Sequence, residues 1–135
     1  IFIGKGKILK KGKRIAFLNL GTRLKKVLEI NEMIKNHHKL NCTVVDMRFA
    51  KPIDTKLIQN LNKTHDIFIT IEENAIGGFS SQVNDFLINK LNKTPKILNF
   101  FMKDEFIDQS DIDDQYNKSG ISKELIFDKI STLLK

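Results

Sequence analysis

The chain has little of several residue types, and each shortage excludes a class of protein. Cys42 is the only cysteine, so no disulfide can form within the chain, and a reducing compartment is expected. No apolar run reaches 18 residues, so we expect no membrane span, and no secretory signal pattern opens the sequence. Ile1 is not an initiator methionine, so we expect a piece of a longer polypeptide. The 135 residues are enough for one domain with its own core.

Arginine is also scarce, although the chain is basic. The net charge is +7, but only three of the 23 basic residues are arginine, the residue that makes bidentate contacts with nucleic-acid bases. The charge is uneven, because residues 1–39 carry eleven lysines or arginines whereas residues 104–114 carry six acids and no base. We interpret these charges as a solvated surface, and contact between chains or domains is the alternative. Nucleic acid is not an expected partner.

Apolar residues alternate between strand and helix spacing along the sequence. We expect a β-hairpin of residues 7–10 and 14–20, with its lysine-rich first arm at the edge of a sheet. The elements expected next are a helix up to His38, strand 42–45, helix 55–61, strand 67–71, a helix over 79–91, strand 96–101 and a last helix capped by Ser122. This order predicts an α/β three-layer sandwich with a mostly parallel sheet, an antiparallel edge strand and helices on both faces.

The segment from Val44 to Asp54 is the first candidate for function. The run from Cys42 to Val45 is apolar, as a buried parallel strand should be, and Asp54 can cap the helix that follows. We interpret Cys42 itself as a small buried hydrophobe. Arg48 therefore lies just past the carboxyl end of a strand, where open α/β sheets bind ligands, and it can hold a phosphate or carboxylate. The alternative is that Arg48 pairs with a local aspartate and only braces the loop.

A second polar group follows the next buried strand. Glu72 and Glu73 stand at its carboxyl end and are candidates for acid–base chemistry. Alternatively, one of them caps or pairs locally and the other is solvated. Gly77-Gly78 precedes a predicted helix and is either a weak anion site at the helix N-terminus or simply a turn.

The three histidines do not indicate a metal site. His37 and His38 close a predicted helix and, being adjacent, do not share a helix face. We expect His65 in an exposed turn beside Asp66. The sequence contains no Walker motif, no GxGxxG and no cysteine–histidine metal pattern.

Several of these segments resemble, in order along the chain, the C-terminal domain of the 1-deoxy-D-xylulose-5-phosphate synthase family. Residues 46–54 are similar to its Asp-x-Arg-Phe-x-Lys-Pro-Leu-Asp segment, and residues 72–78 to its Glu-Glu-Asn-Ala…Gly-Gly segment. Residues 104–109 resemble its Asp-x-Phe-Ile-x-Gln segment, and residues 3–6 resemble the start of that domain. The strand-end Glu-Glu with paired glycines is broader, because it recurs across transketolase-type domains.

The resemblance also implies domain boundaries, and it is weaker in some loops. Residues 1–6 are expected to end an inter-domain linker, and residues 7–135 to form a transketolase C-terminal-like domain. Lys103, Ser110 and residues 79–81 depart from the family's pattern, so the resemblance implies the fold but not the shapes of those loops.

The resemblance implies a transferase that joins pyruvate to glyceraldehyde 3-phosphate and releases carbon dioxide, in isoprenoid precursor, thiamine and pyridoxal biosynthesis. Thiamine diphosphate and magnesium would be held by preceding domains of the same polypeptide, so this chain alone is expected to bind neither and to be inactive. Arg48 matches the family's arginine for the phosphate of glyceraldehyde 3-phosphate. The residues expected to shape a loop or domain interface are Glu72, Glu73, Asn74, Gly77 and Gly78.

Further implications are a homodimer, a bacterial cytoplasm or plastid-type organelle as the compartment, and no catalytic residue or metal ligand in this chain. Two alternative hypotheses remain. In the first, the chain is the C-terminal domain of another thiamine enzyme, such as the β subunit of a 2-oxoacid dehydrogenase. In the second, it is a non-enzymatic module for anion binding or dimerisation.

Overall fold

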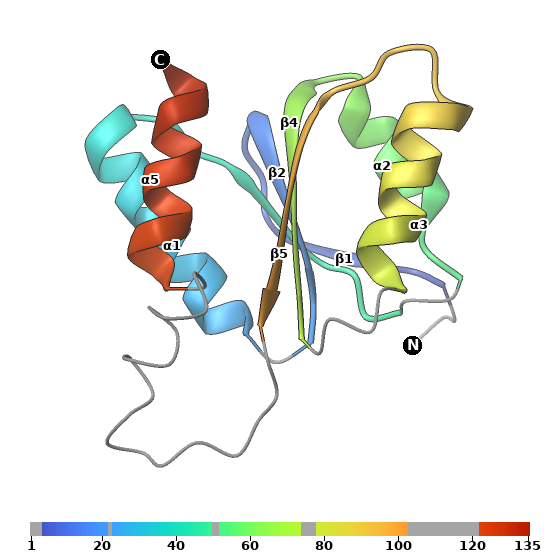
Figure 1. Ribbon diagram of the computed structural model, residues 1–135, viewed down its shortest axis with the longest axis horizontal. Helices are drawn as coiled ribbons and strands as arrows, with labels where there is room; N and C mark the ends of the chain where they lie inside the picture. The colour runs from blue at the N-terminus through green and yellow to red at the C-terminus, as the bar shows by residue number, and fades with distance from the viewer. Residues whose placement is uncertain (1–3, 22, 50–51, 74–77, 103–121) are drawn as a thin grey trace.

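A computed structural model describes residues 4–21, 23–49, 52–73, 78–102 and 122–135, together with the arrangement of their helices and strands (Figure 1). The elements in chain order are β1 (Lys7–Lys10), β2 (Arg14–Leu20), α1 (Leu24–His38), β3 (Thr43–Asp46), α2 (Thr55–Asn62), β4 (His65–Glu73), α3 (Phe79–Asp85), the π-helical turn η1 (Phe86–Lys90), β5 (Lys96–Met102) and α5 (Lys123–Leu134).

The strands form one five-stranded sheet in the order β1-β3-β2-β4-β5. The pairs β2–β3, β2–β4 and β4–β5 are parallel, and only β1 runs antiparallel to its neighbour. The predicted α/β fold, with its mostly parallel sheet and lysine-rich antiparallel edge strand, is confirmed. Because β2 to β5 are parallel, their carboxyl ends meet at one edge of the sheet and their amino ends at the other.

The predicted hairpin is wrong, because β1 pairs with β3 and not with β2. Lys7 lies opposite Asp46, and Ile8 lies opposite Val45. Both edges of β2 are occupied by β3 and β4, so β1 cannot pair with β2, and it pairs with the outer edge of β3. The connection from β1 to β2 passes close to the chain before β3, where a Cβ on Gly12 would overlap with the carbonyl oxygen of Asn41.

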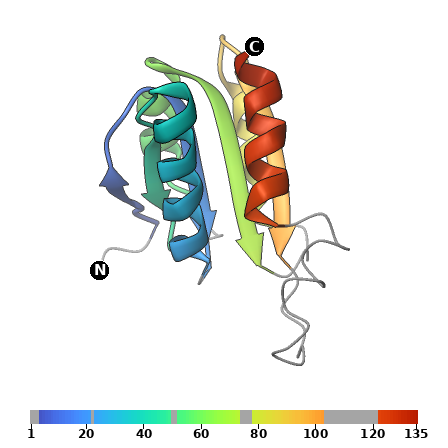
Figure 2. The ribbon, with the colours of Figure 1, turned by 90° about the vertical axis from the view of Figure 1, so that its left-hand side faces the viewer.

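Helices cover both faces of the sheet, α1 and α5 on one side and α2 and α3 on the other (Figure 1). Figure 2 shows α1 and α5 side by side in front of their face. Each face has its own apolar cluster, one centred on Ile15 and Phe17 and the other on Ala16 and Leu18, because successive side chains of β2 point to opposite faces. Central strands buried on both faces explain the nearly continuous apolar runs of the sequence.

Helix capping follows two of the predictions. The Asp54 carboxylate accepts a hydrogen bond from the Leu57 backbone N–H over 3.1 Å, and the Ser122 hydroxyl accepts one from the Leu125 N–H over 3.2 Å. Each interaction satisfies a backbone donor that the first helical turn leaves unpaired.

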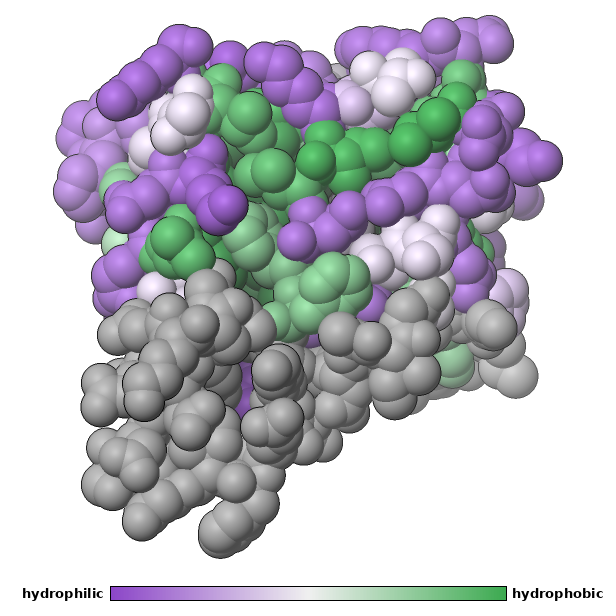
Figure 3. Space-filling view, in the orientation of Figure 1, coloured by the Kyte–Doolittle hydropathy of each residue, from purple (hydrophilic) through white to green (hydrophobic). Residues whose placement is uncertain are grey.

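The surface along β5, the other edge strand, is largely apolar. Figure 3 shows hydrophobic surface between α5 and α3, where Ile97 and Leu98 of β5 are half-buried. Among the described residues, no helix combines the length and apolar character that a membrane span requires.

Candidate functional site

Polar residues gather where the parallel strands end. Asn19 of β2 lies beside Asp46 of β3 in the parallel register, and Leu20 lies beside Glu72 of β4. Arg48 follows two residues after β3 ends. The position predicted for Arg48, just past the carboxyl end of a buried strand, is therefore the one that it occupies.

The chain turns sharply at Arg48. Its backbone is left-handed, with φ of 64°, and its N–H donates to Asp46 Oδ1 over 3.2 Å. The preceding residue, Met47, is buried, and its N–H donates to the carbonyl oxygen of Asn19 over 2.8 Å. A buried anchor and a hydrogen-bonded turn thus hold the backbone while the Arg48 side chain remains exposed at the sheet edge.

Arg48 also contacts the carboxylate of Asp46, as the alternative interpretation expected. The distance from Arg48 Nε to Asp46 Oδ2 is 4.0 Å, which is the outer limit of an ion pair. A partly exposed pair of this kind contributes less than about 1 kcal/mol. Asp46 therefore orients the arginine without binding it strongly, and a doubly charged phosphate can compete for the guanidinium.

Glu72 is buried and caps the helix that follows. Its Oε2 accepts a hydrogen bond from the Ser80 N–H over 3.0 Å, at the start of α3. Burial raises the pKa of the Glu72 carboxyl, and the backbone N–H groups of Ser80 and Phe79 offset part of that increase. The carboxylate lies where an anion at this helix N-terminus would bind, which leaves less reason to expect a ligand there.

The other predicted residues of this loop are Gly78, which directly precedes α3, and Glu73, Asn74 and Gly77. Gly78 has a φ of −91° and open space where a Cβ would lie, so its backbone does not require glycine. The side chain of Glu73, and Asn74 and Gly77 entirely, lie outside the described residues.

Asn19 is a polar residue of this edge that the sequence interpretation missed. It is fully buried, and its Nδ2 donates to the carbonyl oxygen of Gly21 over 3.2 Å. Its Oδ1 is buried with no hydrogen-bond partner among the described residues. The available signal was a lone asparagine in the otherwise apolar run of β2.

The prediction that His65 is exposed is wrong. β4 begins at His65, which turns the ring into the protein, where it is 3 % exposed. Its Nδ1 lies 2.9 Å from the carbonyl oxygen of Leu61 and its Nε2 lies 2.7 Å from Thr43 Oγ1, so Nδ1 carries the proton and Nε2 accepts. Burial lowers the pKa of His65, which keeps the ring neutral at neutral pH.

The remaining nucleophile and metal candidates are structural. Cys42 is buried, and burial raises the pKa of its thiol to about 12, in agreement with its interpretation as a small hydrophobe. His37 and His38 end α1 as predicted, and the Nε2 of His38 lies 2.8 Å from the Ser131 hydroxyl on α5. No group of three His, Cys, Asp or Glu side chains in the described part of the chain is placed to hold a metal ion.

The fold and the strand-end arginine define a class: an open, mostly parallel α/β domain whose carboxyl edge can receive an anionic ligand. Comparison with known families narrows this class. Residues 4–126 match the model of the transketolase C-terminal domain, and the chain belongs to that family.

Curated relatives carry a more specific name. The chain is 42 % identical over 130 residues to the 1-deoxy-D-xylulose-5-phosphate synthase of Psychromonas ingrahamii, covering 92 % of this chain and 20 % of that protein. It is 48 % identical over 108 residues to the protein of that name from Proteus mirabilis, covering 79 % of this chain and 16 % of that one. The chain thus spans about a fifth of the length of these relatives.

Solved structures agree with the fold. A split-gene transketolase, described as an inactive β4 tetramer, superposes with a TM-score of 0.79 at 26 % identity, covering 98 % of this chain and 42 % of that one. The transketolase of Campylobacter jejuni superposes with a TM-score of 0.62 at 16 % identity, covering 96 % of this chain and 18 % of that one. The second likeness concerns the fold alone.

Proposed function

We propose that this chain is the C-terminal domain of a 1-deoxy-D-xylulose-5-phosphate synthase, which joins pyruvate to glyceraldehyde 3-phosphate and releases carbon dioxide. The support is 40–48 % identity to curated proteins of that name, together with membership of the transketolase C-terminal family. In this proposal, preceding domains of the same polypeptide supply the rest of the enzyme, and the whole protein is a homodimer.

The position of Arg48 is the observation that carries the proposal. The residue lies at the ligand-binding edge of a parallel sheet, and its side chain is exposed to that edge. Its planar guanidinium matches phosphate oxygens in a bidentate contact. We assign to Arg48 the phosphate of glyceraldehyde 3-phosphate, so that binding energy at this remote group helps to orient the aldehyde for attack.

The turn at Arg48 supports this role. The left-handed backbone of Arg48 costs about 1–2 kcal/mol. Hydrogen bonds from Arg48 N–H to Asp46 and from Met47 N–H to Asn19 hold the turn in place. Strain retained at a strand end is typical of functional sites. A turn fixed in advance lowers the entropy lost when phosphate binds.

The polar loop after β4 has a supporting role in the proposal. Glu72 fixes the start of α3, which shapes the loop between them. We assign loop shaping or contact with a neighbouring domain, rather than proton transfer, to the following set: Glu72, Glu73, Asn74, Gly77 and Gly78.

Thiamine diphosphate and magnesium belong to the preceding domains in this proposal. Thiamine diphosphate supplies the carbanion chemistry when it is bound. The described residues do not fit a magnesium ion, since they include no cluster of three suitable side chains. The contribution of this chain is therefore to bind and orient the phosphorylated substrate.

The test is Arg48→Ala in the complete protein. We expect kcat/KM for glyceraldehyde 3-phosphate to fall roughly 30-fold to 900-fold, because a charged partner of the phosphate is lost. This fall corresponds to a loss of about 2–4 kcal/mol in transition-state stabilisation. The KM for pyruvate should hardly change. Unphosphorylated glyceraldehyde provides an internal comparison, because its kcat/KM should be nearly the same in parent and variant.

Lys129→Ala, on the exposed side of α5, is the matched control and should behave as the parent. Equal losses for phosphorylated and unphosphorylated aldehyde would contradict the phosphate role. Turnover with a lipoyl acceptor in place of the aldehyde would instead support a 2-oxoacid dehydrogenase.

A further inference from the structure

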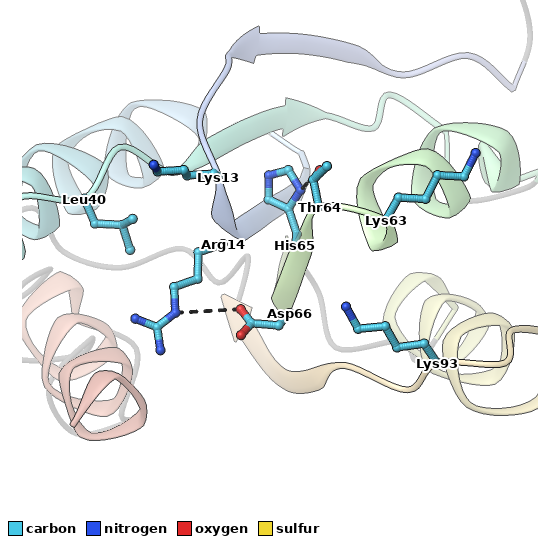
Figure 4. A pocket seen from close by; sticks show the side chains of 8 residues that line it. All are labelled: Lys13, Arg14, Leu40, Lys63, Thr64, His65, Asp66 and Lys93. Carbon is cyan, nitrogen blue, oxygen red and sulfur yellow. Dashed lines mark hydrogen bonds and ion pairs between the residues drawn. The ribbon is translucent and has the colours of Figure 1, made fainter.

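A cavity of about 340 Å³ lies at the amino-terminal edge of the sheet, opposite the edge that carries Arg48. Figure 4 shows it from close by. The start of β2, the end of α2, the start of β4 and the loop before β5 contribute its lining. The side chains that matter for its chemistry are Lys13, Arg14, Lys63, His65, Asp66 and Lys93.

The cavity is strongly cationic. Four basic side chains line it, from Lys13, Arg14, Lys63 and Lys93, against the single carboxylate of Asp66, which leaves a net charge of +3. The carboxyl ends of α1, α2, η1 and α5 lie at this same edge (Figure 1), and their partial negative charges reduce the positive potential. The formal charge of the lining side chains nevertheless stays positive. Within the described residues, no salt bridge joins any of the three lysines to a carboxylate.

Two of the cations lie around Asp66. Arg14 Nε is 3.8 Å from Asp66 Oδ1 in a half-exposed pair, which contributes little to stability. In Figure 4 the Arg14 guanidinium lies on one side of Asp66 and the Lys93 ammonium on the other. Arg14 has a φ of 73°, and the β2–β4 register shifts between Arg14 and Ile15. The unusual backbone at Arg14 therefore accompanies a side chain that points into the cavity.

The backbone around the cavity is held by hydrogen bonds to neighbouring segments of the chain. Lys13 N–H donates to the carbonyl oxygen of Asn41 over 2.9 Å. The carbonyl oxygen of Lys93 accepts from Nδ2 of the buried Asn62 over 2.9 Å. The buried, neutral ring of His65 adds no charge of its own to the lining. The backbone positions of Lys13 and Lys93 are thus fixed before a ligand binds, which reduces the backbone entropy lost on binding.

We propose that this cavity binds a small polyanion that carries phosphate groups, with Arg14 and Lys93 as its direct contacts and Lys13 and Lys63 adding to the positive potential. A guanidinium and an ammonium together suit the clustered oxygens of a diphosphate better than a single carboxylate. The volume lies within the range of small-molecule sites. A small surface depression with one arginine does not suit an extended nucleic acid.

This site is separate from the substrate site proposed at Arg48. β2 has seven residues, and at 3.3 Å per residue its two ends are about 20 Å apart. One small ligand cannot contact both edges. The inference therefore goes beyond the proposed function, and the two can fail independently.

The test is a titration of the ¹⁵N-labelled chain with inorganic diphosphate, followed by NMR. We expect saturable shifts in the backbone signals of Arg14, Asp66 and Lys93. Lys93→Ala should weaken binding about tenfold, as for the loss of one charged hydrogen bond. Asp66→Asn should tighten it severalfold, because the competing carboxylate is removed. Lys56→Ala, exposed at the start of α2, should bind as the parent does.

The comparison arms separate the outcomes. Tighter binding of an organic diphosphate ester than of free diphosphate would identify an ester as the natural source, and the reverse would identify free diphosphate. The proposal is overturned if no shift saturates, if citrate binds equally well, or if Lys93→Ala has no effect. Shifts confined to the neighbourhood of Arg48 and abolished by Arg48→Ala would overturn this inference while leaving the proposed function intact.

Discussion

The backbone N–H of Arg48 donates to the side chain of Asp46, two residues before it, over 3.2 Å. The same carboxylate lies 4.0 Å from the Arg48 side chain through its other oxygen. One aspartate therefore stabilises the left-handed turn and also orients the guanidinium that the turn presents.

Replacing Asp46 separates these two effects. We expect Asp46→Ala to lower kcat/KM for the phosphorylated substrate of the complete protein about tenfold, because the turn loses its hydrogen-bond acceptor. Asp46→Asn keeps an acceptor oxygen and should recover most of the activity. Steady-state kinetics of both variants test this relation, and equal losses would indicate that the charge of Asp46 matters and the hydrogen bond does not.

Gly12 is required by a close approach of two backbone segments. A Cβ added there would overlap with the Asn41 carbonyl group, and the three nearest atoms all belong to backbone that cannot rotate away. We expect Gly12→Ala to destabilise the chain by about 2–4 kcal/mol, from overpacking and from strain on the Gly12–Thr43 and Lys13–Asn41 hydrogen bonds.

Urea unfolding of Gly12→Ala provides the measurement. Gly78→Ala is its matched control, because no atom lies within 4 Å of the added Cβ, and the change should stay within about 0.5 kcal/mol. Similar losses in both variants would show that the close approach at Gly12 is not the cause.

The sequence was sufficient to predict the fold where local patterns decide the structure. Apolar periodicity located the helices and central strands, and Asp54 and Ser122 cap helices as expected. The predicted hairpin was wrong because the partner of β1 depends on which strand edges are free, and this is decided only when the whole sheet forms. The segment around Gly12 resembles a tight hairpin turn in the sequence, but in the structure Gly12 lies against the backbone of Asn41.

The candidate sites divide in the same way. Arg48 was located because a strand followed by an extended loop is a local signal. His65 and Asn19 were missed because their burial depends on neighbours distant in sequence, such as Thr43 for His65 and Asp46 for Asn19. The cationic cavity could not be predicted from the sequence either, because its four basic residues come from three separate parts of the chain.

His65 should make stability depend on pH. Burial lowers its pKa from the ordinary 6.5, so the unfolded chain binds more protons than the folded chain in the window below that value. The contribution of His65 to stability is therefore present above pH 6.5 and is lost as the pH falls through the folded pKa. NMR titration of the His65 ring should give a midpoint below 6.5. Unfolding experiments should show a pH slope in this window that His65→Gln reduces, and a midpoint at or above 6.5 would contradict the prediction.

Glu72 should act in the opposite direction. Because burial raises its pKa above the ordinary 4.5, the folded chain holds this proton more tightly than the unfolded chain. Its contribution to stability is complete below pH 4.5 and is lost as the pH rises through the folded pKa. Glu72→Gln keeps an oxygen for the Ser80 N–H but cannot ionise, so the variant should gain stability relative to the parent as the pH rises from about 4.5 to neutrality.

Glu72→Ala is the comparison that isolates the cap. It removes both the titration and the hydrogen-bond acceptor, so it should follow the pH dependence of Glu72→Gln with about 1 kcal/mol less stability. Urea unfolding of the three proteins across this pH range measures both effects. Parallel curves for parent and Glu72→Gln would show that Glu72 does not change its protonation on unfolding. Coincident curves for the two variants would show that the hydrogen bond to Ser80 contributes nothing to the start of α3.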